Sequence, residues 1–317
     1  MRGVLVVNPH ATTTSPRVTD VLVHALADEV DLTVVRTEHR GHAAQIAERA
    51  AAEGAQIVCV LGGDGTVNEV VNGMLGDQPA PAGPLLAIIP GGSANVAARA
   101  LGLPADPVEA TGEILQALRE QRTRTIGLGR VTITPWEEEA WAPRWFLANA
   151  GLGIDAEIIA AMEGDRARGH EATPTRYLTT TIRQFLWRTE RREPALTVAL
   201  PDGDVDGVFL AIVQNTSPWT FFGSLPIAPC PDASFDTGLD LFAVRRMGIG
   251  TAMRLARRMV AGSRAGSTAR SLTVAHDVPR ISVRTSRPIA VQVDGEGLGD
   301  AGRADFSAVP AALTVVA

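Results

Sequence analysis

Short apolar runs alternate with amphipathic segments through the first part of the chain, and this alternation strongly limits the folds open to it. Four runs have the composition of strands buried on both faces: Val4–Val7, Leu32–Arg36, Ile57–Leu61 and Leu85–Ile89. Helical periodicity follows in Arg17–Ala27, Ala43–Ala52, Thr66–Met74 and Pro107–Glu120. This order predicts a mostly parallel sheet with helices on both faces. Ligands of such sheets gather at the carboxyl ends of the strands.

The sequence changes character beyond residue 124, where short alternating runs are separated by Pro, Gly and Asp. These runs are Arg130–Thr134, Leu196–Leu200, Val208–Val213, Leu239–Val244, Arg280–Thr285 and Ile289–Val293. They predict an antiparallel sandwich or barrel. Two helical segments, Tyr177–Arg188 and Ile249–Val260, interrupt the pattern. The expected fold class is therefore α/β plus β, with a parallel N-terminal sheet and a C-terminal antiparallel β-sandwich.

Two glycine-rich turns follow predicted strands and precede predicted helices. The turn Gly62–Thr66 comes after Ile57–Leu61, and Gly91-Gly92-Ser93 comes after Leu85–Ile89. Glycine lets the backbone approach an anion closely, and the N–H groups at a helix start attract negative charge. Asp64 adds a carboxylate of the kind that Mg²⁺ prefers beside phosphate oxygens. The turns indicate a nucleotide-using enzyme, whereas the alternative is two tight turns with ordinary helix caps.

All 29 basic residues are arginine, because the chain contains no lysine. This excludes a Walker A site, a lysine-dependent protein-kinase site and a lysine Schiff base. The net charge of −6 argues against general nucleic-acid binding. Two cysteines without metal-ligand spacing favour a reducing cytoplasm. No apolar stretch reaches the roughly 18–20 residues of a membrane span, so a soluble or membrane-surface protein is expected.

Asp294-Gly295-Glu296 follows the predicted strand Ile289–Val293 and has two alternative interpretations. Asp-Gly is a favoured pair in β-hairpin turns, which would make the segment purely structural. A carboxylate there could instead act as a general base that takes the proton from an alcohol attacking a phosphoryl group. The sequence leaves both interpretations open.

An arginine-rich segment lies between Arg245 and Arg270, with seven arginines and no acidic residue. Such a segment is consistent with docking on anionic lipid headgroups at a membrane surface. A solvated helix face carrying ordinary surface charge is the alternative.

Taken together, these motifs resemble the diacylglycerol kinase catalytic family, especially its soluble bacterial lipid kinases. The similar segments are Asn8-Pro9, Thr37 with Gly41-His42-Ala43, Gly62–Gly73, Gly91–Asn95, Asn149–Ala156 and Asp294–Glu296. The resemblance implies a nucleotide-binding α/β domain over residues 1–125 joined by 305–317, and a lipid-substrate β-sandwich over residues 126–304. It also implies that ATP and Mg²⁺ are the cofactors.

The resemblance assigns roles to residues of this chain. The implied ATP-binding residues are Asn8, Thr37, Gly62, Gly63, Asp64, Gly65, Thr66, Val67, Asn68, Glu69, Gly91, Gly92, Ser93 and Asn95. The candidate catalytic residues are Glu296 as general base, Asp294 and Asp64, with Asp64 holding the Mg²⁺ of ATP. Asn68 and Glu69 are expected to hold the loop and the water shell of the metal.

The family also carries a structural Mg²⁺ near an Asp-Gly-x-Leu element of its second domain. The corresponding residues here are Ser234, Asp236, Thr237 and Leu239. Thr237 stands where many family members have aspartate, which puts this metal site in doubt.

The expected activity is transfer of the γ-phosphoryl group of ATP to a lipid hydroxyl, with diacylglycerol giving phosphatidic acid. The alternatives are an NAD kinase-type phosphotransferase and a non-catalytic, nucleotide-gated lipid-binding regulator. The expected location is cytoplasmic and peripheral at the inner membrane face, through Arg245–Arg270. No nucleic-acid partner is expected, and a homodimer is left open.

Overall fold

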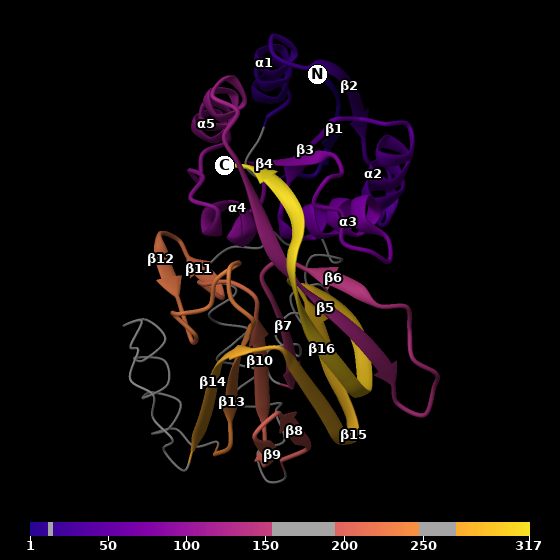
Figure 1. Ribbon diagram of the computed structural model, residues 1–317, viewed down its shortest axis with the longest axis vertical. Coiled ribbons are helices and arrows are strands. Elements are labelled where there is room, and N and C mark those ends of the chain that lie inside the picture. Colours follow the sequence, from indigo (N-terminus) through magenta and orange to yellow (C-terminus); the bar gives the residue numbers. More distant parts are fainter. Residues whose placement is uncertain (12–14, 154–193, 247–270) are drawn as a thin grey trace. The chain divides into compact units, whose positions relative to one another are not determined.

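The computed structural model describes residues 1–11, 15–153, 194–246 and 271–317. The chain divides into two compact units, which are labelled by element in Figure 1. Unit 1 comprises Met1–Leu128 and Val309–Ala317, and unit 2 comprises Gly129–Ala308. The chain leaves unit 1 within strand β5 (Thr123–Pro135) and returns within strand β16 (Glu296–Val316). Among the described residues, no helix has both the length and the apolar character needed to cross a membrane.

Unit 1 contains the predicted parallel sheet. Its strands are β1 (Arg2–Val7), β2 (Asp31–Arg36), β3 (Ile57–Gly62) and β4 (Leu85–Pro90), in the order β4-β3-β1-β2. The end of β16 lies parallel beside β4, where Val315 is paired with Leu86. The strand that returns from unit 2 therefore completes the sheet of unit 1.

The described residues of unit 1 form the helices α1 (Pro16–Ala27), α2 (His42–Ala52), α3 (Asp64–Leu75), α4 (Val96–Ala100) and α5 (Pro107–Arg119). In Figure 1, α1 and α5 lie together on one face of the sheet, and α2 and α3 lie together on the other. This division follows from right-handed crossovers, because the strand order reverses direction after β2. The predicted helices are present, although α3 begins two residues earlier than expected, at Asp64.

The prediction that Leu32–Arg36 forms a strand buried on both faces was wrong about burial. The strand exists as β2, but most of its residues are exposed or half-buried, and Val34 is 40% exposed. The cause is position, because β2 lies at the edge of the sheet next to β1. By contrast, every residue of the central strand β3 is buried.

Unit 2 is built from antiparallel strands, as predicted. Besides its part of β5, it contains β6 (Arg144–Phe146), β7 (Asn149–Gly153), β8 (Leu196–Leu200), β9 (Gly203–Val208), β10 (Leu210–Gln214), β11 (Thr220–Phe222), β12 (Leu225–Ile227), β13 (Leu239–Val244), β14 (Leu272–Val278) and β15 (Arg280–Val293). The main order is β14-β13-β10-β7-β15-β16, with β8 also beside β15 and β9 beside β8. Apolar side chains from these strands form a large core, and a second, smaller cluster contains Ile212, Phe242 and Leu272.

Two predicted strand boundaries in unit 2 were wrong. Arg280–Thr285 and Ile289–Val293 form one strand, β15, whose pairing with β16 shifts register between Arg284 and Ile289. Pro288 lies in this shift, where its missing N–H costs no ladder hydrogen bond. Val208–Val213 instead divides between β9 and β10. The predicted helices Tyr177–Arg188 and Ile249–Val260, and most of Arg245–Arg270, lie outside the described residues.

Candidate active site

The two glycine turns of unit 1 lie directly against each other. The N–H of Gly91 donates to the carbonyl oxygen of Gly62 over 2.8 Å. A Cβ atom built on Gly92 would lie 2.7 Å from the Cα atom of Gly63, closer than real Cβ contacts. Because β3 and β4 are neighbours, their carboxyl ends carry both turns to the same edge of the sheet. The two glycine turns therefore lie side by side within unit 1.

The closeness of the two turns predicts a large effect of a single methyl group. We expect Gly92→Ala to lower the free energy of unfolding by about 1–3 kcal/mol, because the Cβ atom meets backbone that must shift. The measurement is chemical denaturation followed by circular dichroism. Gly112→Ala in α5 is the matched control, because a Cβ atom there meets nothing within 4 Å. Equal stability of the two variants would contradict the predicted close packing.

Helix α3 begins at the first glycine turn with a glycine as its N-cap residue, so no N-cap side chain covers its first turn. Asn8 fixes one side of this turn, because its Nδ2 donates to Oγ1 of Thr66 over 2.9 Å. Thr37 follows β2 and donates its N–H to the carbonyl oxygen of Val7. Asn8, Thr37 and Thr66 therefore lie at the carboxyl edge that also carries the glycine turns.

The second glycine turn is closed by Asn95. Its Oδ1 accepts from the N–H of Gly92 over 2.8 Å, and its Nδ2 donates to the carbonyl oxygen of Gly92 over 2.7 Å. Asn95 adopts a left-handed backbone conformation, with φ of 49°, which asparagine tolerates better than most residues. Ser93 lies exposed within this turn, where a hydroxyl can reach an anion.

Asp64 connects the two turns from within the first turn of α3. Its Oδ1 accepts from the N–H of Ala97, near the start of α4, over 3.1 Å. One carboxylate oxygen is therefore engaged by the backbone that follows the second glycine turn. The role of Asp64 as a ligand of Mg²⁺ stays a prediction.

Residues 67–69 follow the turn Gly62–Thr66 within α3 and make contacts inside unit 1. The side chains of Val67 and Asn68 are almost completely buried. Glu69 reaches to the start of α2, where its two carboxylate oxygens accept from the N–H groups of Gly41 and Ala43 over 2.9 and 3.2 Å. A carboxylate at a helix N-terminus is stabilised by the helix dipole. Glu69 therefore ties the start of α2 to α3, and its expected role in the loop and the water shell of the metal stays a prediction.

In unit 2, Asp294 and Gly295 form a two-residue hairpin turn between β15 and β16. Both have positive φ, 47° and 80°, and Val293 is paired with Glu296 across the turn. Positive φ at both central residues is typical of a type I′ turn, which Asp-Gly favours. The segment therefore forms a hairpin turn, and the role of Glu296 as a general base stays a prediction.

The carboxylate of Asp294 is buried and bound by backbone. It accepts from the N–H groups of Leu147, Ala148 and Asn149 over 2.8, 2.9 and 3.0 Å. The N–H of Asp294 in turn donates to the carbonyl oxygen of Asn149. Three charge-assisted hydrogen bonds hold the hairpin turn to the segment between β6 and β7. These hydrogen bonds anchor the hairpin turn through Asp294, and the catalytic role of Asp294 stays a prediction.

Glu296, two residues further on, is differently placed. Its side chain is 15% exposed, and its Oε2 lies 3.0 Å from Nη2 of Arg144, whose side chain is 29% exposed. Sequence reasoning missed Arg144, because it belongs to no recognised motif. It also missed Gln292, whose Nε2 donates to Oδ1 of Asn149 and whose Oε1 accepts from the N–H of Gly295. Paired side chains of this kind appear only when the strands are assembled.

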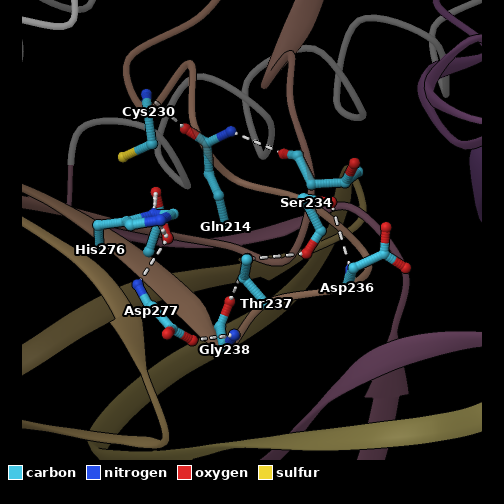
Figure 2. A network of polar contacts seen from close by, with 10 residues as sticks. Gln214, Cys230, Ser234, Asp236, Thr237, Gly238, His276 and Asp277 are labelled. Carbon is cyan, nitrogen blue, oxygen red and sulfur yellow. Dashed lines mark hydrogen bonds and ion pairs between the residues drawn. The ribbon is translucent and has the colours of Figure 1, made fainter.

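The residues of the predicted structural metal site form a hydrogen-bonded turn. Figure 2 shows the turn formed by Ser234, Asp236, Thr237 and Gly238. The carbonyl oxygen of Ser234 accepts from both the N–H and the Oγ1 of Thr237, over 3.1 and 3.0 Å. Thr237 therefore supplies a hydrogen-bond donor where a metal ligand would supply a charged oxygen. These residues do not fit a divalent cation, and no cluster of His, Cys, Asp or Glu suited to a metal occurs in the described ranges.

Close to this turn, the side chain of Asp240 forms a hydrogen bond with the side chain of His276. Nδ1 of His276 lies 2.8 Å from Oδ1 of Asp240, and Oδ1 of Asp277 accepts from the N–H of Gly238 (Figure 2). Burial raises the pKa of Asp240 above its usual value, although the hydrogen bonds from His276 and Asp277 oppose this. The hydrogen bond to Asp240 raises the pKa of His276. The pair joins β13 to β14.

Comparison with known proteins gives a consistent result. Residues 2–131 match the diacylglycerol kinase catalytic domain. A Pseudomonas aeruginosa protein named "Probable lipid kinase YegS-like" is 30% identical over 290 residues, which cover 90% of this chain and 84% of that protein. A diacylglycerol kinase of Bacillus subtilis is 26% identical over 266 residues, covering 81% of this chain and 76% of that protein.

The fold is similar to that of a solved structure. The crystal structure of a diacylglycerol kinase from Bacillus anthracis has a TM-score of 0.70 to this chain at 21% identity. The similarity covers 99% of this chain and 96% of that one. The predicted fold class is thereby confirmed.

Proposed function

The chain belongs to the family of the diacylglycerol kinase catalytic domain and the YegS-like lipid kinases, and we propose that it transfers the γ-phosphoryl group of ATP to diacylglycerol, giving phosphatidic acid. The observation that carries the phosphoryl-transfer part is the pair of touching glycine turns at the start of α3. Membership of a lipid kinase family supports the lipid acceptor, and the similarity to the Bacillus subtilis diacylglycerol kinase supports this particular lipid.

In this proposal, backbone N–H groups provide most of the phosphate binding in unit 1. The first turn of α3 offers N–H groups at the positive end of a helix dipole. In the turn Gly91–Ser93 the N–H groups of Gly91 and Gly92 already donate to Gly62 and Asn95, so the exposed hydroxyl of Ser93 is the group this turn would offer. The triphosphate arrives as the Mg²⁺ complex of ATP, which is a substrate, and Asp64 would contact that ion through its carboxylate. Because the chain has no lysine, any side-chain cation at the phosphates is arginine.

Glu296 acts as the general base in the proposed reaction. The lipid hydroxyl oxygen forms a bond to the γ-phosphorus, and the bond between that phosphorus and the bridging oxygen of ADP breaks in line. The hydroxyl proton passes to the Glu296 carboxylate, and ADP leaves with the bridging oxygen. Phosphoryl transfer depends chiefly on positioning and charge stabilisation, so a single well-placed carboxylate suffices as the proton acceptor.

The test is a transfer assay with the purified chain, Mg-ATP labelled at the γ-phosphate, and a panel of acceptors in mixed micelles. The panel contains diacylglycerol, phosphatidylglycerol, a sphingoid base and NAD, and each labelled product is identified by mass. We expect labelled phosphatidic acid to be the main product. Label on another lipid would contradict diacylglycerol as the substrate but would still support a lipid kinase. Label on NAD alone would support an NAD kinase. ATP binding without any transfer would support a regulatory protein.

A further inference from the structure

We propose that Arg144 is a positioning residue that holds the Glu296 carboxylate ready to accept a proton. The inference rests on the proposed role of Glu296 as general base. Arg144 has no assigned role in the sequence motifs, and the ion pair that it forms is the observation that singles it out.

Among the described residues of unit 2, this ion pair is more enclosed than the other arginine–carboxylate pairs. Nη2 of Arg144 lies 3.0 Å from Oε2 of Glu296, with the side chains 29% and 15% exposed. In the pair of Arg284 with Asp204, by comparison, the side chains are 55% and 48% exposed. Solvent and salt screen exposed pairs strongly and half-buried pairs less. Arg144 therefore restrains its carboxylate more effectively than a surface arginine would.

The carboxylate of Asp294 holds both the backbone near Arg144 and the backbone near Glu296. Arg144 begins β6, which leads directly to the three N–H groups that Asp294 accepts from. Glu296 begins β16, two residues after Asp294. Asp294 therefore fixes the strand that carries the arginine and the hairpin that carries the carboxylate relative to each other.

The residue next to Arg144 adds a further restraint. Trp145 is 1% exposed, and the guanidinium carbon of Arg130 lies 5.1 Å from the centroid of its ring. This cation–π contact and the burial of the indole keep β6 in place beside β5. Arg144 thus extends from a rigid strand, which is the arrangement that a precise catalytic geometry requires.

The chemical benefit is preorganisation of the base. A glutamate side chain has several rotamers, and an orientation that misplaces the carboxylate by about 1 Å can cost on the order of a hundredfold in rate. A planar guanidinium fixes the direction of a carboxylate as well as its charge, which a lysine ammonium does less well. We therefore expect Arg144 to act on the catalytic step and to have little influence on nucleotide binding.

The experiment compares wild type, Arg144→Met, Arg144→Lys and the control Arg284→Met in the lipid transfer assay. For Arg144→Met we expect kcat to fall about 10- to 100-fold, with KM for ATP changed less than about twofold. Arg144→Lys should recover part of the loss, and Arg284→Met should behave as wild type. In the Glu296→Gln background, Arg144→Met should cause no further loss of kcat, because the two residues act together. A fully additive loss would overturn the proposal.

A crystal structure of Arg144→Met separates this inference from the proposed function. We expect the Glu296 side chain to lose its single orientation while the Asp294 hydrogen bonds to residues 147–149 remain. An unchanged Glu296 rotamer would show that Arg144 does not position it, whatever the protein phosphorylates. If the wild type transferred phosphate to no acceptor but the rotamer changed as expected, only the proposed function would fail.

Discussion

Replacement of Glu296 by glutamine is expected to lower kcat for phosphoryl transfer about 10²- to 10⁴-fold, the range typical of general bases. Glutamine has the shape of glutamate, but its amide cannot take the proton of the attacking hydroxyl. The glycine turns and the start of α3 belong to unit 1 and are unchanged, so the dissociation constant of ATP should stay within about twofold. Single-turnover transfer and isothermal titration with an ATP analogue measure the two quantities.

Two controls make this result specific. Glu138→Gln changes an exposed carboxylate in the loop before β6 and should leave kcat unchanged. Thermal unfolding of Glu296→Gln checks that the half-buried Arg144 has not destabilised unit 2 after losing its charged partner. A folded Glu296→Gln protein that retains a third or more of the wild-type kcat would remove Glu296 from the mechanism.

Removal of the Asp294 carboxylate is expected to cause the largest loss of stability. Asp294→Ala leaves the buried N–H groups of Leu147, Ala148 and Asn149 without their acceptor. A buried donor left unsatisfied costs about 1–3 kcal/mol, so the combined loss is about 4 kcal/mol. For a unit of this size, such a loss corresponds to a fall in Tm of about 10 °C, measured by differential scanning calorimetry.

Two further variants define the origin of that loss. Asp294→Asn keeps one acceptor oxygen and should be of intermediate stability, whereas Asp204→Ala removes an exposed carboxylate paired with Arg284 and should cost less than about 1 kcal/mol. If Asp294→Ala were as stable as Asp204→Ala, the turn would not depend on these hydrogen bonds. The proposed role of Asp294 as a structural residue would then be wrong.

The parallel sheet and its two glycine turns were predictable because the information is local. Each buried run is followed by its turn and helix, and neighbouring parallel strands place their carboxyl ends at the same edge. Edge position is not local, and for that reason Leu32–Arg36 was predicted as buried although β2 is mostly exposed. The contact of Asp64 with Ala97 was equally unpredictable, because it depends on how α4 lies against α3.

The arrangement around Glu296 shows a second limit of sequence reasoning. Asp294 and Glu296 are chemically similar and nearly adjacent, yet one binds three backbone N–H groups and the other pairs with an arginine 152 positions away. The different contacts of the two residues become visible only when the strands are assembled and residues 147–149 lie beside this hairpin. At the predicted metal element, the departure of Thr237 from the family pattern was visible in the sequence, whereas its hydrogen bonds to the carbonyl oxygen of Ser234 were not.

The contact between the two glycine turns has an evolutionary consequence. A Cβ atom on Gly92 would lie 2.7 Å from the Cα atom of Gly63, and one on Gly63 would lie 3.3 Å from the Cα atom of Gly92, so a side chain at either position presses on backbone and not on a movable side chain. Drift at one position therefore cannot be compensated by a point change at the other. Descendants of this protein are expected to keep both glycines, or to lose both of them together with nucleotide binding.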